Sequence, residues 1–175
     1  ILQQLFNAAD LAVVGQFRGP HAMAAVGSNA PVISLLINFF IGISLGTNVV
    51  LANAIGAKDE SRIKKCVHTS IYTSAICGVL LAIFGEFAAG YILNWMSVPE
   101  ECFKLATLYL RIYLLGMPVI LLYNFEAAIY RAIGDTKTPL TALVISGITN
   151  VILNIALVCG GGMSVDGVAI ATVAS

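Results

Sequence analysis

The chain has 175 residues, of which 59% are hydrophobic and only 10% carry charge, and its formal net charge is zero. A soluble domain carries about 25% charged residues, so this composition excludes an ordinary soluble globular protein. It indicates an all-α, polytopic integral membrane protein whose surroundings are a lipid bilayer, and the neutral charge balance gives no sign of a nucleic-acid partner.

The cysteines and the chain ends add two expectations. Four scattered cysteines follow no CxxC or Cys/His spacing, so no metal site or bound cofactor is expected. The chain begins with Ile1 inside one apolar segment and reaches Ser175 about ten residues into another, and no cleavable signal peptide is recognisable. We therefore expect a fragment cut through a helix at both ends.

The apolar stretches predict a bundle of about six transmembrane helices, with the first and last truncated. Polar loops rich in Gly, Pro or charge separate them. The expected spans are residues 1–15, 30–56, 66–87, 105–130, 139–160 and 165–175.

The first span carries three polar residues, Gln3, Asn7 and Asp10, at spacings of four and three. These spacings place all three side chains on one face of a helix. A carboxylate facing hydrocarbon costs roughly 2.5–3.5 kcal/mol on insertion scales, so Asp10 is expected to face protein or a water-filled cavity, as a candidate proton or cation site. The alternatives are a structural acid bonded to a neighbouring helix and a helix-end residue near the headgroups.

Two prolines and an arginine lie in or beside the next spans. Pro31 is expected near the start of the second span, where its missing N–H does no harm. Pro118 interrupts the fourth span and is expected to kink it. Arg111, in the same span, is expected to reach the interface or to pair with an acid such as Glu100.

The fifth span carries a second polar stripe, in which Ser146, Asn150 and Asn154 are spaced by four and four. Unsatisfied polar groups are costly in lipid, so this stripe and that of Asp10 are expected to face a common interior. One carboxylate with amide and hydroxyl oxygens suits H⁺ or Na⁺, because a carboxylate withdrawn from water takes up a proton more readily. Taken alone, the asparagines are better explained by hydrogen bonding between helices.

The basic residues set an orientation. Loops 56–66 and 131–138 lie on the same side and hold six of the nine Lys and Arg residues. By the positive-inside rule these two loops are expected to be cytoplasmic.

Several short motifs resemble those of the multidrug and toxic compound extrusion (MATE) transporters. The first-helix pattern Asp10–Gly15 is followed by Ala24–Gly27, Gly56–Asp59, Arg131–Pro139 and Asn150–Asn154, in the order and spacing of that family. The resemblance covers essentially the whole chain. It implies a helical transporter and not an enzyme, in the plasma membrane of a bacterium.

The resemblance further implies that the chain is half of a transporter. Family members have twelve helices in two lobes and exchange Na⁺ or H⁺ for organic cations or other amphiphilic, drug-like molecules by alternating access. Residues 1–175 would form most of the N-terminal lobe, whose partner is the missing C-terminal lobe of the same chain.

The resemblance also assigns site residues. In the DinF-like bacterial branch a cation site maps onto Asp10, Asn150, Asn154 and Thr172, and Gln3 and Asn7 would line the substrate cavity. That branch often has Asp where this chain has Asn154, so Asp10 is expected to be the only titrating group of the lobe.

Three other functions stay open. A lipid-linked oligosaccharide or peptidoglycan-precursor flippase of the same superfamily would need a cavity rich in Arg or Lys, and only Arg111 is embedded here. An intramembrane enzyme would need catalytic partners that His21 and His68 lack. A non-transporting scaffold would be excluded by activity that depends on Asp10.

Overall fold

The computed structural model describes residues 2–160 and 162–175, and it leaves the side chains of residues 2–7, 9, 18 and 159 undescribed. Its elements are α1 (Leu2–Arg18), α2 (Pro20–Gly56), α3 (Glu60–Trp95), α4 (Glu100–Leu115), α5 (Met117–Ala132), α6 (Lys137–Ile155), a π-helical turn η1 (Ala156–Gly160) and α7 (Val165–Ala174). The described residues include no strand.

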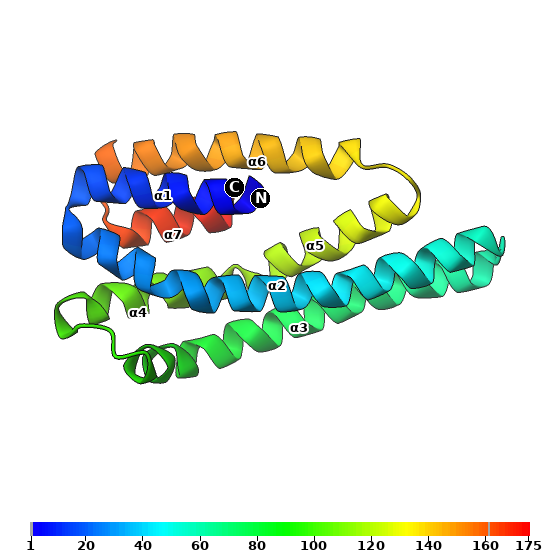
Figure 1. The fold of residues 1–175 in the computed structure, drawn as a ribbon, viewed down its shortest axis with the longest axis horizontal. Coiled ribbons are helices and arrows are strands. Elements are labelled where there is room, and N and C mark those ends of the chain that lie inside the picture. The colour runs from blue at the N-terminus through cyan, green and yellow to red at the C-terminus, as the bar shows by residue number, and fades with distance from the viewer. Residues whose placement is uncertain (1, 161) are drawn as a thin grey trace.

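Two long antiparallel helices, α2 and α3, run the length of the molecule (Figure 1). The pair α4 and α5 packs along them, and α1 and α6 lie together on the opposite side with α7 between them and α4. Fully buried apolar side chains, among them Val14, Leu93, Leu110 and Val168, belong to a core to which α1, α2, α3, α4 and α7 all contribute.

The helix ends follow from local backbone chemistry. Gly19 separates α1 from α2 with φ of +83°, a left-handed conformation that favours glycine. Asp59 caps α3 by accepting the Arg62 backbone N–H. Gly134, with φ of +86°, turns the chain between α5 and α6.

The expected kink at Pro118 is confirmed. Helices α4 and α5 meet at Gly116 with a bend of 48°. Pro118 is the second residue of α5, a position at which its missing N–H is tolerated. Its ring clashes with the backbone of the preceding turn, so α5 cannot continue α4 as one straight helix.

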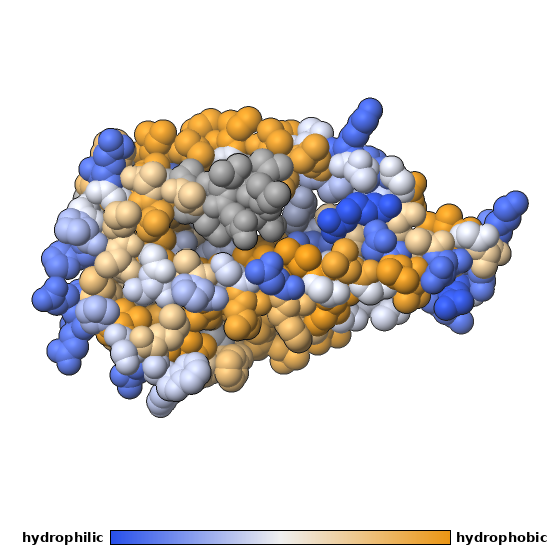
Figure 2. Space-filling view, in the orientation of Figure 1, coloured by the Kyte–Doolittle hydropathy of each residue, from blue (hydrophilic) through white to orange (hydrophobic). Residues whose placement is uncertain are grey.

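Length and composition make this an all-α polytopic membrane protein. Helices α2 and α3 and the segment Lys137–Val158 are each long and apolar enough to cross a bilayer, and α4 with α5 qualifies as one bent span. Hydrophilic residues gather mainly towards the two ends of the long axis, with apolar surface between them (Figure 2).

One expectation about an individual residue was wrong. Pro31 lies inside α2 and not near its start, because the helix already begins at Pro20, eleven residues earlier. Arg111 pairs with an acid, which was one of its two expected alternatives, but this acid is Glu86 of α3, at 3.7 Å from Arg111 Nε, and not Glu100. The helices α2 and α3 also extend beyond the expected spans 30–56 and 66–87, because hydropathy marks only the apolar part of a helix.

Candidate functional site

The site is built around Asp10, whose side chain is only 1% exposed. Asn154 Nδ2 of α6 donates to Asp10 Oδ1, and Thr172 Oγ1 of α7 lies 3.1 Å from Asp10 Oδ2. Three helices therefore meet at one carboxylate, and each of its oxygens has a hydrogen-bond donor. Such bonds to an ionised group contribute about 1.5–3 kcal/mol each.

The bonds continue into a closed ring. Asn154 Nδ2 also donates to Asn150 Oδ1 at 3.1 Å, and Asn150 Nδ2 donates to Thr172 Oγ1 at 3.3 Å. The Thr172 hydroxyl lies 2.8 Å from the Val168 carbonyl as well. A hydroxyl carries a single proton, so Thr172 donates either to Asp10 or to Val168, and the ring can rearrange without breaking a helix.

One acceptor in this ring is left over. Asn154 Oδ1 is buried and has no hydrogen-bond partner among the described residues, although burying an unpaired polar atom is costly. It belongs to a set of oxygens that also includes Asp10, Asn150 and Thr172. Oxygen donors with a single carboxylate suit a proton or a hard monovalent cation. The described residues contain no cluster of three His, Cys, Asp or Glu side chains that could hold a metal ion.

A cavity of about 280 Å³ adjoins the ring. Asn150 and Thr172 are on its wall, so an ion or water in the cavity reaches the ring directly. Ser146, the third member of the fifth-span stripe, lies on the cavity wall and takes no part in the hydrogen-bonded ring. The remaining wall is largely apolar and includes Tyr113 and Tyr123, and the Tyr123 hydroxyl donates to the Pro139 carbonyl at 2.9 Å.

Two tyrosines belong to the site although sequence reasoning missed them. Tyr109 and Tyr113 of α4 are both 3% exposed, and Tyr113 lies on the wall of the cavity that adjoins the ring. Their rings lie 6.1 Å apart. A spacing of four on one helix face was the available signal, but it does not distinguish a buried pair from tyrosines at the membrane interface.

The sequence-predicted site residues divide into two groups. Asp10, Asn150, Asn154 and Thr172 come together from three helices, as described above. Gln3 and Asn7 lie on α1, but their side chains are outside the described residues.

A family model described as MatE matches residues 1–156. The chain belongs to the MATE family. This family consists of membrane transport proteins and not enzymes, in agreement with the helical fold and the buried polar ring.

Similar proteins cover almost all of this chain. The probable multidrug resistance protein YoeA of Bacillus subtilis is 36% identical over 160 residues, which are 91% of this chain and 35% of that protein. The probable multidrug resistance protein NorM of Thermotoga maritima is 29% identical over 100% of this chain and 38% of its own length. A crystal structure of a MATE protein in the bent conformation matches 99% of this chain with a TM-score of 0.94 and 31% identity, and this match covers 38% of that structure. The MATE chain therefore spans little more than a third of the length of these relatives.

Proposed function

We propose that this MATE chain is the N-terminal lobe of a secondary active exporter that exchanges H⁺ or Na⁺ for organic cations and other amphiphilic drugs. The observation that carries the proposal is the ring in which Asp10 of α1 is bonded to Asn154 of α6 and Thr172 of α7. The similarity to two probable multidrug resistance proteins supports the substrate class.

Asp10 is the coupling group in this proposal. When the site is empty, hydrogen bonds from Asn154 and Thr172 stabilise the negative charge of the Asp10 carboxylate. Binding of H⁺ or Na⁺ removes the net charge, and Na⁺ would recruit the unpartnered Asn154 Oδ1 as a ligand. A carboxamide at position 154 leaves one negative charge in the ring, which suits one monovalent cation for each cycle.

Alternating access follows from the helices that the ring connects. A loaded ring and an empty ring bond α1 to α6 and α7 differently, so cation binding favours one arrangement of these helices over the other. In this scheme Gln3 and Asn7 face the substrate. The cation enters from outside as the drug leaves, and the empty site accepts drug from inside.

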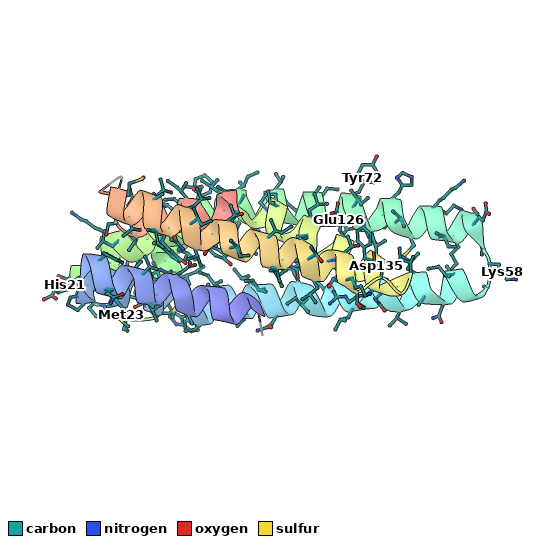
Figure 3. All side chains as sticks on the ribbon, turned by 90° about the horizontal axis from the view of Figure 1, so that it is seen from above. His21, Met23, Lys58, Tyr72, Glu126 and Asp135 are labelled. Carbon is teal, nitrogen blue, oxygen red and sulfur yellow. The ribbon has the colours of Figure 1, made fainter. Side chains whose placement is uncertain are left out.

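The proposed orientation places loops 56–66 and 131–138 in the cytoplasm of a bacterium. Figure 3 shows Lys58 at one end of the molecule, with Asp135 towards that end, and His21 at the other end. This arrangement supports a common side for the two basic loops, as the positive-inside rule requires.

The deciding experiment uses the complete transporter with Asp10→Asn. Efflux of ethidium or a fluoroquinolone is measured with a pH gradient and with a Na⁺ gradient, at matched expression. We expect Asp10→Asn to reduce gradient-driven efflux to background, because an amide takes up no proton and carries no charge. Glu126→Gln, which removes an exposed acid of α5, is the control and is expected to transport normally. Undiminished efflux by Asp10→Asn would refute the proposed coupling site.

The wild type also distinguishes the alternatives. The gradient that drives efflux by the wild type identifies the coupling ion. Transport of a pyrophosphate-linked lipid without drug efflux would support the flippase function. The described cavity lining contains no Lys or Arg, and Arg111 is paired with Glu86, so the described site offers no cationic cradle for a pyrophosphate.

A further inference from the structure

A second hollow lies far from Asp10, along the seam between α2 and α3. It is a groove of about 370 Å³, and Phe125 of α5 is among its lining residues. From α3 it is lined by Arg62, Lys65, Thr69 and Thr73. The drug-transport proposal gives this groove no role.

The basic end of the groove is not electrically compensated. Arg62 and Lys65 are exposed, and within the described residues neither charged group has an ion-pair partner. Asp59 and Glu60 are the nearest acids along the chain, and within the described residues neither forms an ion pair with Arg62 or Lys65. Asp59 uses its carboxylate to accept the Arg62 backbone N–H at 3.0 Å. No acidic side chain lines the groove. Two adjacent unpaired cations favour an anion with several oxygen acceptors.

The chemistry of the groove changes along its length. Arg62 and Thr73 are eleven residues apart on α3, which corresponds to about 16 Å along the helix axis. Towards the Thr73 end, the hydroxyls of Thr69 and Thr73 donate no hydrogen bond within the described part of the chain, whereas the Ser70 hydroxyl bonds the Cys66 carbonyl at 2.8 Å. From the Arg62 end towards Thr73, the groove therefore presents two cationic side chains and then two hydroxyls that are free to donate.

The opposite wall, which α2 supplies, is mainly apolar but also includes Thr47. Ile43 and Val50 of α2 are both exposed and both line the groove, with 42% and 43% of their surface accessible. A free phosphate ion would leave this apolar surface uncovered, whereas a hydrocarbon chain would cover it.

An exposed tyrosine, Tyr72, is the neighbour in sequence of Thr73, which lines the groove. Tyr72, which is 66% exposed, points outward from α3 on the part of the molecule between its middle and the Lys58 end (Figure 3). Exposed tyrosines favour the membrane–water interface. Lys65 and Arg62 lie about 10 and 15 Å beyond Tyr72 along the helix, towards the turn at Lys58.

We propose that this groove binds an anionic glycerophospholipid. Arg62 and Lys65 contact the phosphate oxygens of its headgroup, Thr69 and Thr73 donate to its phosphate or ester oxygens, and an acyl chain lies against Ile43 and Val50. Basic pockets between transmembrane helices bind anionic lipid headgroups in this manner.

The test uses the purified complete transporter and a pair of matched double variants. Arg62→Gln with Lys65→Gln removes the two cations of the groove. Lys58→Gln with Lys64→Gln removes two cations of the same segment that do not line it. Native mass spectrometry measures how much phosphatidylglycerol each protein retains, after addition to protein that is otherwise in phosphatidylcholine.

We expect the groove variant to bind phosphatidylglycerol about 30-fold more weakly than the wild type, from the usual contribution of two basic residues near an anionic lipid. The control variant is expected to stay near the wild type. Equal loss in both variants, or no loss in either, would overturn the proposal, since both results mean that binding depends on diffuse surface charge or on another site.

Cys66 supplies an independent readout, because it lines the groove and is half-buried. In a variant that keeps Cys66 as its single cysteine, alkylation by a maleimide is compared in phosphatidylcholine, with added phosphatidylglycerol and with added inorganic phosphate. Protection by phosphatidylglycerol alone, abolished by the groove substitutions, supports the lipid. Equal protection by inorganic phosphate, or a Cys66 that is unreactive under all conditions because the rest of the transporter covers it, overturns the proposal.

Discussion

Replacing Gly78 by alanine tests whether α3 and α5 are held together by a close backbone approach. A Cβ at Gly78 would lie 2.4 Å from Pro118 Cα and 2.9 Å from Pro118 N. These are backbone atoms of a proline, so no side-chain rotation relieves the clash. The two helices have to separate by about 1 Å to restore ordinary contact at 3.4 Å.

The magnitude follows from a comparison on the same helix. Overpacking costs about 1–3 kcal/mol, and replacing glycine by alanine inside a helix recovers up to about 1 kcal/mol. A Cβ at Gly90 of α3 would meet nothing within 4 Å, so Gly90→Ala gives the helix gain alone. The difference in the free energy of unfolding between the two variants is therefore about 1–3 kcal/mol, and the rigid Pro118 backbone favours the upper end of this range.

The assay is denaturant unfolding of the complete protein in detergent micelles. Gly78→Ala is expected to unfold at lower denaturant than the wild type, and Gly90→Ala at an equal or higher concentration. Identical midpoints for the two variants would show that α3 does not depend on the close approach to Pro118, and this would refute the packing argument.

Three further predictions concern the site and the α5–α6 loop. Gly116→Ala would place a methyl group 2.4 Å from Val173 Cγ2, beside Thr172, so we expect a weaker cation response that Val173→Ala restores in the double variant, as measured by gradient-driven efflux. Thr172→Val removes a donor to Asp10 and an acceptor for Asn150, so the fold should survive while unfolding free energy falls by about 1.5–3 kcal/mol at neutral pH. The Thr138 hydroxyl and the backbone N–H groups of Thr138 and Lys137 hold the pKa of Asp135 below its ordinary value of 3.8. The pKa of Asp135 is lower in the folded than in the unfolded state, so its carboxylate stabilises the fold above pH 3.8 and this stabilisation is lost as the pH falls through the folded-state pKa. The free energy of unfolding of Asp135→Asn should therefore depend less on acid pH than that of the wild type.

Much of the ring was predictable because two strong constraints act on it. The helical period puts Asn150 and Asn154 on one face, and the cost of charge in lipid turns Asp10 inward. The resemblance to the family then added Thr172. The structure supplies what neither source contains, namely which oxygen each amide bonds and that Asn154 Oδ1 is unpartnered among the described residues.

The features that the sequence did not predict have a common physical cause. Hydropathy describes each helix alone and says nothing about which helices are its neighbours. Arg111 pairs with Glu86 because α3 and α4 are neighbours, and no pattern within α4 indicates that neighbour. Tyr109 and Tyr113 are compatible with a membrane interface until the helices packed against α4 bury them. Pro31 falls inside α2 because the polar residues before the apolar run are helical too.

The bend at Gly116 bears on how this protein enters its membrane. Helices α4 and α5 have 16 residues each, or about 24 Å, which is less than the roughly 30 Å of a bilayer core. Neither can cross alone, and α4 also begins with two acids and carries Arg111. Gly78 and Gly85 of α3 closely approach Pro118 and Leu114. Helix α3 is therefore the surface against which α4 and α5 pack. We accordingly expect insertion of the bent α4–α5 pair to depend on α3 already being in place, so a weakened contact at Gly78 would reduce the yield of inserted protein as well as its stability.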